Sequence, residues 1–161
     1  MATAQPLDVL RQALERYLVE SFGDYEQDAD GDYVVRRGSA VVYVRPLEWQ
    51  QGQTLVRIWS VTNIGVRVDG ELTRFLATEN RSFVFGGFAL EESGPAVIFG
   101  HTLLGDFLSR EEVAQAVAAV AETADEYDDR IRARFGGRLP SQPGSALQRF
   151  LSKFMPGDGG A

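Results

Sequence analysis

Two neighbouring segments of this chain carry large apolar side chains at both odd and even positions, and this pattern constrains the fold more than any other feature. They are FVFGGFAL (residues 83–90) and AVIFGHTLL (residues 96–104), joined by a turn at Gly94-Pro95. Successive side chains of a β-strand point to opposite faces of the sheet, so both faces need a cover. One layer of helices can cover only one face. We therefore expect the second face to be covered by a bound peptide, by a second copy of the chain or by the chain's own tail. The alternative is that the short helix and the loops complete the core.

Three helices are predicted from apolar residues that recur at three- and four-residue intervals. The first begins near Leu7 and ends at Gly23, and the second is a short helix over Glu71–Thr78. The third is long. It begins at Ser109, which opens a capping-box sequence, and it ends at the glycine pair Gly136-Gly137, whose backbone tolerates the left-handed conformation common at helix ends.

Three further strands are predicted before the second helix, from segments rich in β-branched and aromatic residues. They are DYVVRR (32–37), AVVYVRPL (40–47) and TLVRIWSVT (54–62). Hairpin-length turns join most neighbouring strands, which favours a mainly antiparallel sheet. The predicted fold is therefore α+β, a five-stranded sheet with helices packed on it in the order αβββαββα.

Composition excludes several classes of function. The formal net charge of −7 opposes binding to nucleic acid, whose affinity comes largely from clustered Lys and Arg. No apolar run approaches the roughly 20 residues that a membrane-spanning helix requires. The helical spacing of apolar residues in the first segment predicts a helix of the mature protein rather than a signal peptide. The chain has no cysteine, which excludes disulfides and thiolate metal sites and fits a reducing compartment. We therefore expect a cytoplasmic location.

Residues that catalysis needs are sparse. His101 is the only histidine, and a transition-metal site requires several His or Cys ligands. The acidic segment Glu26–Gly31 resembles the opening of a calcium loop, but Arg37 stands where a bidentate acid is expected. The acid-rich segment ETADEYDD (122–129) is interpreted as the solvated face of the third helix. Phosphate-binding and dinucleotide-binding glycine spacings are absent, so we predict no enzyme activity, no metal site and no cofactor.

The chain after Gly137 differs from the rest. Pro140, Pro143 and Gly144 interrupt regular structure, which is typical of a linker. A short amphipathic segment follows from Ser145, and its predicted anchor residues are Leu147, Phe150, Leu151 and Phe154. A helix of this length is marginal alone in water, so we expect it to dock on protein; a frayed tail or a weak membrane-surface contact are the alternatives. The chain thus divides into a domain over residues 1–137 and a tail over residues 138–161.

Three segments together resemble a known family. They are LTRFLATENRSFVFGGFAL, AVIFGHTLLGDFLSREEV and AVAETADEYDDRIRARFGG, and over residues 7–137 the chain resembles the YbjN-type family of small bacterial proteins. The family's motifs are patterns of apolar residues, Asn, Gly and Tyr without a catalytic signature. Its fold is similar to that of type III secretion chaperones, which commonly form homodimers. The resemblance therefore implies a chaperone-like or regulatory peptide-binding module.

We accordingly expect a non-enzymatic module that holds a protein or peptide client on an apolar surface of the sheet and the first helix. Large aromatic side chains concentrate binding energy in interfaces. The expected apolar contacts are Trp59, Phe83, Phe85, Phe88 and Phe99, with Leu10, Leu14 and Tyr17 if the first helix is used. The sequence does not fix which strand face points outward, so some of these residues belong to the core. The alternative is a homodimeric structural or regulatory protein whose apolar face serves only self-assembly.

Overall fold

The computed structural model describes residues 5–50 and 52–140. Its elements in chain order are α1 (Pro6–Phe22), β1 (Glu26–Gln27), β2 (Tyr33–Arg37), β3 (Ala40–Glu48), β4 (Thr54–Ile64), α2 (Gly70–Glu79), the 3₁₀ turn η1 (Asn80–Ser82), β5 (Gly87–Glu91), β6 (Ala96–Leu104) and α3 (Arg110–Phe135). Within the described residues the strands form one antiparallel sheet in the order β1-β2-β3-β4-β6-β5. The predicted α+β class and element order are confirmed, with the two-residue strand β1 as an addition.

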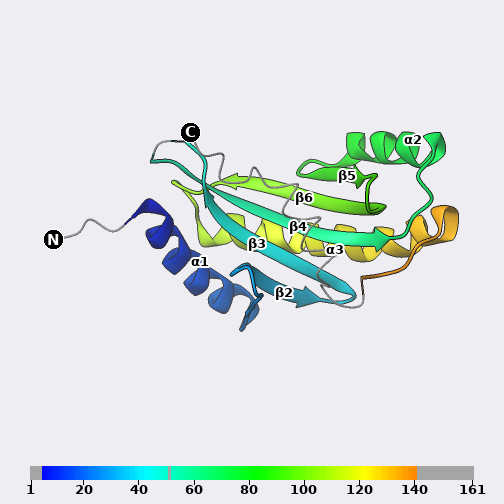
Figure 1. Cartoon of the computed structure of the whole chain (residues 1–161). Coiled ribbons are helices and arrows are strands. Elements are labelled where there is room, and N and C mark those ends of the chain that lie inside the picture. The colour runs from blue at the N-terminus through cyan, green and yellow to red at the C-terminus, as the bar shows by residue number, and fades with distance from the viewer. Residues whose placement is uncertain (1–4, 51, 141–161) are drawn as a thin grey trace.

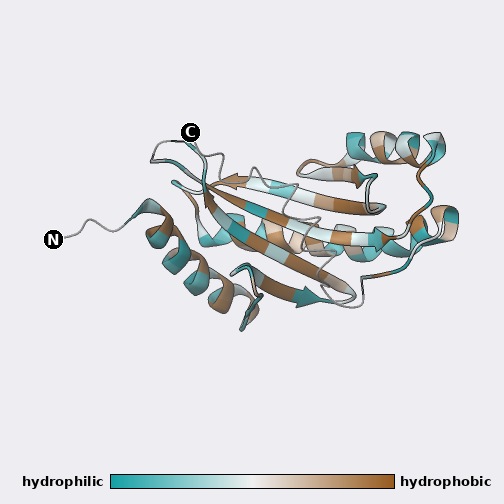
Figure 2. Ribbon diagram, in the orientation of Figure 1, coloured by the Kyte–Doolittle hydropathy of each residue, from teal (hydrophilic) through white to brown (hydrophobic). Residues whose placement is uncertain are grey.

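The helices lie on one face of the sheet. Figure 1 shows α3 running behind the strands, and α2 lies beside β5. The buried residues of α1, α2 and α3 join the inward-facing residues of the strands in one large cluster, the helix-side core. Figure 2 shows hydrophobic residues concentrated in the central strands, where they recur along each strand. The long helix α3 therefore supplies most of the cover for one face of the sheet.

Both ends of α3 form as the sequence predicts. The Ser109 side chain accepts a hydrogen bond from the Glu112 backbone N–H, and the Glu112 carboxylate accepts one from the Ser109 N–H at 2.9 Å. These two bonds satisfy donors that a helix start leaves without partners. At the other end Gly136 has φ 73° and Gly137 has φ 83°, conformations that strongly favour glycine.

The β5 strand begins later than the sequence predicts. Gly86 has φ 79°, and a Cβ atom at this position would lie 2.7 Å from the Gly100 carbonyl oxygen. The chain turns sharply there, so the alternation expected from residue 83 onward is wrong before Gly87. Phe83 consequently packs into the helix-side core against Phe88, with ring centroids 5.5 Å apart, whereas Phe85 is 63% exposed.

The acid-rich part of α3 is not wholly solvated, which corrects the sequence interpretation. Asp128 is buried and accepts a hydrogen bond from the Ser39 hydroxyl at 2.7 Å. Asp125 accepts a second bond from Ser39, and these bonds lower the pKa of its carboxyl. The Asn63 side chain also donates to the Asp128 carbonyl at 2.9 Å. These contacts tie α3 to the β2–β3 turn and to the end of β4.

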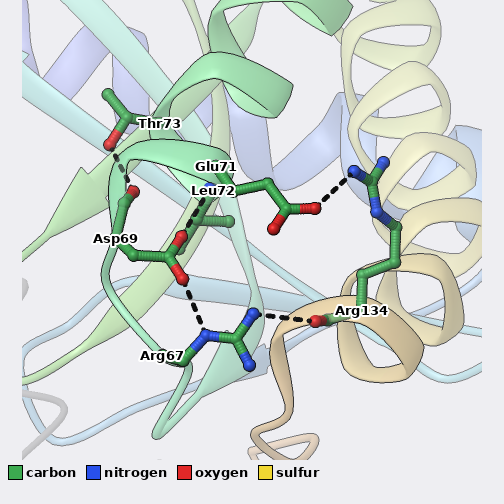
Figure 3. Close-up of polar contacts among 6 residues, drawn as sticks. All are labelled: Arg67, Asp69, Glu71, Leu72, Thr73 and Arg134. Carbon is green, nitrogen blue, oxygen red and sulfur yellow. Dashed lines mark hydrogen bonds and ion pairs between the residues drawn. The ribbon is translucent and has the colours of Figure 1, made fainter.

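A polar network fixes the start of α2 against the end of α3 (Figure 3). The Asp69 carboxylate accepts from the Leu72 backbone N–H at 2.9 Å, which caps α2, and from Arg67 Nε at 2.7 Å. Both bonds lower the pKa of Asp69. Arg67 also donates to the Arg134 carbonyl at 3.3 Å, and the Arg134 guanidinium pairs with Glu71 at 3.1 Å. The point at which the chain leaves α3 is therefore held in place.

Two phenylalanines that the sequence offers as client contacts differ sharply in burial, and stability measurements can separate them. Phe99→Ala removes a side chain that is 1% exposed, so we expect the free energy of unfolding to fall by about 3–5 kcal/mol. Phe85→Ala truncates a side chain that is mostly in solvent, and its effect should stay within about 0.5 kcal/mol. Urea denaturation followed by circular dichroism measures both; equal losses would contradict this assignment.

Candidate functional site

The face of the sheet opposite the helices carries a second apolar cluster, here called the second face. Its buried members are Val34, Tyr43, Trp59, Val61, Ala96 and Ile98, and the half-buried Val41, Leu47 and Ile64 pack against them. All nine lie on β2, β3, β4 or β6. Over the described ranges, then, this cluster is built from strand residues alone.

An ordered aromatic and charged group lies at the centre of the second face. The Tyr43 and Trp59 rings stack with centroids 5.4 Å apart and planes inclined by 15°. The Arg45 guanidinium lies over the Trp59 ring at 5.4 Å. Burial raises the pKa of Tyr43 to about 12, so its hydroxyl stays protonated at neutral pH. This group offers flat apolar area together with a cation.

Arg45 is held in position by a buried acid. Its Nε and a terminal nitrogen both donate to the Asp32 carboxylate at 2.5 Å, a two-pronged geometry that suits a carboxylate. Asp32 is 2% exposed. Burial raises the pKa of the Asp32 carboxyl, and the bonds from Arg45 oppose that rise. The pair therefore orients Arg45 over Trp59 at the expense of desolvating two charges.

The second face continues beyond its buried centre into a more exposed half. Leu55 pairs with Leu47 on β3 and with Leu104 on β6, so the three side chains lie side by side across the sheet. Leu104 is 60% exposed, and the nearby Trp49 just beyond β3 is 51% exposed. Leu47, Leu55 and Leu104 are here called the open half, and the six buried residues the covered half. A row formed by Arg45, Arg57 and Thr102 lies between the two halves on the same face.

A second apolar feature lies at the β6 edge. β5 pairs with β6 only as far as Gly100, so His101–Leu104 have β4 as their strand neighbour on one side and no described strand on the other. A hollow beside this edge is lined by Phe85, His101, Leu103, Glu112, Gln115, Ala116 and Ala119. The Phe85 and His101 rings lie 5.5 Å apart. Burial lowers the pKa of His101, which favours its neutral form in this apolar setting.

The residues proposed from the sequence as client contacts fall into different places. Leu10, Leu14, Phe88 and Phe99 are buried in the helix-side core, so in the folded domain they are not available to a client. Phe83 and Tyr17 are half-buried and pack against the same core. Phe85 is exposed at the β6 edge, and Trp59 lies in the covered half of the second face. The predicted anchor residues Leu147, Phe150, Leu151 and Phe154 lie outside the described residues.

The second face carries apolar side chains on the side of the sheet away from the helices, as the alternation in the sequence predicts. Its six central residues are 2–6% exposed. Trp59 is the one second-face residue that the sequence offers as a client contact; the others, Tyr43 and Leu104 among them, were missed. The alternation of apolar residues could have found Tyr43 and Leu104. Each is an apolar residue on the side of its strand that points away from the helices.

No group of three or more His, Asp or Glu side chains is placed to hold a metal ion in the part of the chain that the structure describes. Among the described helices, none combines the length and apolar character that crossing a membrane requires.

Comparison with known proteins identifies one family and a shared fold. A family model described as T3SS (YopN, CesT) and YbjN peptide-binding chaperone 1 matches residues 8–143. A chain in the crystal structure of the ExsC–ExsE complex is similar with a TM-score of 0.54 at 20% identity, over 74% of this chain and 94% of that chain. YbjN from E. coli is similar with a TM-score of 0.51 at 15% identity, over 77% of this chain and 92% of that chain. No curated protein matches this chain.

These findings confirm two predictions from the sequence. The resemblance to YbjN-type proteins and type III secretion chaperones is confirmed by the family match. The matching family is one of peptide-binding chaperones rather than enzymes, which agrees with the predicted non-enzymatic character. At these identities the two solved structures show a common fold.

The Asp32–Arg45 pair gives a test of how the second face is built. Arg45→Met leaves a buried carboxylate without its partner, so we expect the free energy of unfolding to fall by about 3 kcal/mol. Adding Asp32→Asn removes the uncompensated charge and should restore most of the loss. Urea denaturation of the wild type, the single variant and the double variant measures the effect. An Arg45→Met variant as stable as the wild type would show that the pair does not hold this face together.

Proposed function

This chain belongs to the T3SS (YopN, CesT) and YbjN peptide-binding chaperone family, and we propose that it holds an apolar segment of a client protein against the second face of its sheet. One observation carries the proposal. The second face carries an apolar cluster over which the described residues place no helix. Beyond a row formed by Arg45, Arg57 and Thr102 it ends at the leucines of the open half, of which Leu104 is 60% exposed. Exposed apolar surface of this kind marks a site of contact with another chain.

The chemistry of the second face favours an apolar client segment with aromatic or branched side chains. Leu47, Leu55 and Leu104 offer a first contact area because they adjoin one another and are not fully buried. The stacked Tyr43 and Trp59 rings lie further along the same face, and large rigid aromatic groups supply much of the binding energy in interfaces. The ExsC–ExsE complex, in which a chain of similar fold is found with another protein, supports this function. We place the function in the cytoplasm, which the absence of cysteine from the sequence fits.

A peptide selection tests this proposal. Full-length protein is immobilised, and a phage-displayed library of random peptides is panned on it. We expect the selected peptides to be rich in apolar residues and to lose at least about tenfold in affinity for the double variant Leu55→Ser/Leu104→Ser, a loss of about 1.4 kcal/mol. Fluorescence anisotropy of a labelled selected peptide measures the dissociation constants.

A matched control separates this site from apolar surface in general. Val9 and Val19 of α1 are 54% and 47% exposed, and α1 packs on the opposite face of the sheet. The double variant Val9→Ser/Val19→Ser removes comparable exposed apolar area and should bind the selected peptides as the wild type does. Peptides that bind the wild type and both double variants with equal affinity would show that the client site lies outside the second face.

Self-assembly is a second candidate function, favoured by the β6 edge. Residues His101–Leu104 present backbone groups that β5 does not pair, and the exposed Phe85 lies beside them. A strand edge next to an apolar hollow is a template for pairing with another chain. A second copy joined at this edge gives a homodimer that leaves the second face free.

Light scattering coupled to size-exclusion chromatography tests the homodimer. We expect a mass near twice 17.7 kDa for the wild type at high concentration. Phe85→Glu should reduce the mass to that of one chain, because it places a charge in the dimer interface. Val19→Glu, on the outer surface of α1, should leave the mass unchanged. A single-chain mass for the wild type at every concentration rules this candidate out.

A further inference from the structure

The side chains of the covered half of the second face are buried, although no described helix or loop residue belongs to their cluster. Tyr43, Trp59, Val61 and Ile98 are between 3% and 6% exposed. Side chains on an uncovered face of a sheet keep their outer surface in water, because neighbouring strands shield only their flanks. Among the described residues, however, only strand residues belong to this cluster. The Arg45 guanidinium covers part of the Trp59 ring, and the remaining burial points to a further layer over these residues.

The burial is graded along the strands, and the gradient has a direction. On β6 the second-face side chains pass from 2% exposed at Ala96 and 5% at Ile98 to 60% at Leu104. On β4 Val61 and Trp59 are buried, whereas Leu55 near the other end is half-buried. The cover therefore lies at the end of the sheet where β4 finishes and β6 begins.

The chain leaves the described domain at this same end. After α3, the segment that follows Gly136 passes beside β4, where the backbone groups of Arg138 and Ile64 exchange two hydrogen bonds of 2.9 Å. Ile64 itself packs against the second-face cluster. The close approach of Gly137 to the Ile64 carbonyl, where a Cβ atom would lie at 2.7 Å, keeps this crossing tight. By Arg138 the chain has therefore crossed from the helix layer to the margin of the second face.

The length and pattern of the remaining chain match the covered half. Residues 141–144 reach at most about 14 Å when extended, and an eleven-residue helix over residues 145–155 is about 16 Å long. The five-residue step from Ile64 back to Trp59 spans about 17 Å along β4. The other residues outside the described ranges, 1–4 and 51, are too few to cover six side chains. The apolar positions at 147, 150, 151 and 154 follow helical spacing.

We propose that residues 145–155 of the same chain dock on the covered half of the second face through Leu147, Phe150, Leu151 and Phe154, and that a client must displace them. The tail is then an internal competitor for the peptide site. This regulatory role rests on the proposed function, whereas the docking itself does not. Docking within one chain is independent of protein concentration, which distinguishes it from cover by a second copy.

Tryptophan quenching tests the docking in the full chain. The sequence has two tryptophans, and Trp49 is 51% exposed, so Trp49→Phe leaves Trp59 as the single reporter at little structural risk. We expect weak acrylamide quenching of Trp59 in this background. Adding Phe150→Ser/Leu151→Ser should raise the quenching constant several-fold, since the indole then loses its cover.

Two controls make the result decisive. Arg149→Ser/Lys153→Ser alters the polar side of the same segment and should leave quenching unchanged. Circular dichroism and the urea midpoint verify that the domain stays folded in each variant. Quenching that is unaffected by Phe150→Ser/Leu151→Ser, or that rises when the protein with an intact tail is diluted, overturns the proposal; the second result identifies another copy as the cover.

The competition with a client is measured separately. A selected peptide should bind Phe150→Ser/Leu151→Ser several-fold more tightly than the wild type and Arg149→Ser/Lys153→Ser, because it no longer displaces the tail. Equal affinity for all three proteins overturns the regulatory role. If the library yields no peptide, the proposed function and the regulatory role both fail, while the quenching result still decides the docking. If quenching excludes docking, selected peptides still support the function.

Discussion

A sheet with apolar side chains on both faces cannot be covered by helices that all lie on one side, and the rest of this structure follows from that constraint. α1, α2 and α3 contribute their buried residues to a single core, so the opposite face has to be covered by something else. That face is neither polar nor fully exposed, since its centre is buried while Leu104 at its far end is largely exposed. The chain belongs to a family of peptide-binding chaperones, and this face is where we propose that it holds a client.

Much of the fold could be predicted because local chemistry and global packing agree. The Ser109 capping box, the glycines after α3 and the turn between β5 and β6 each act over a few residues, so their sequence signals are direct. The prediction was wrong at Gly86 because a glycine within an apolar run is read as a strand residue, whereas its positive φ breaks the extended chain and β5 begins only at Gly87. The role of Asp128 could not be predicted either. Its partner Ser39 is distant in sequence and meets it only after α3 crosses the sheet.

The candidate site was less predictable than the fold, for a physical reason. Aromatic residues serve cores and interfaces equally well, so choosing large aromatics selected Phe88 and Phe99, which the helices bury. The choice between core and interface depends on which face the helices cover, and this is decided by packing over the whole domain. Alternation along TLVRIWSVT is enough to group Leu55, Trp59 and Val61 on one side of β4. It could not show that Trp59 is buried while Leu55 is less so.

The Asn80 side chain has a consequence for how the sheet can grow. Its amide accepts a hydrogen bond from the Phe88 N–H at 2.6 Å and donates one to the Phe88 carbonyl at 3.2 Å, so it imitates an additional strand at the outer border of β5. Backbone groups that already have hydrogen-bond partners cannot pair with the strand of another chain, so they do not promote edge-to-edge aggregation. A molecule with exposed apolar side chains beside an incomplete sheet border thereby blocks one route to fibril-like stacking at β5. A short stretch of β6 next to it keeps backbone groups with which an incoming chain can align.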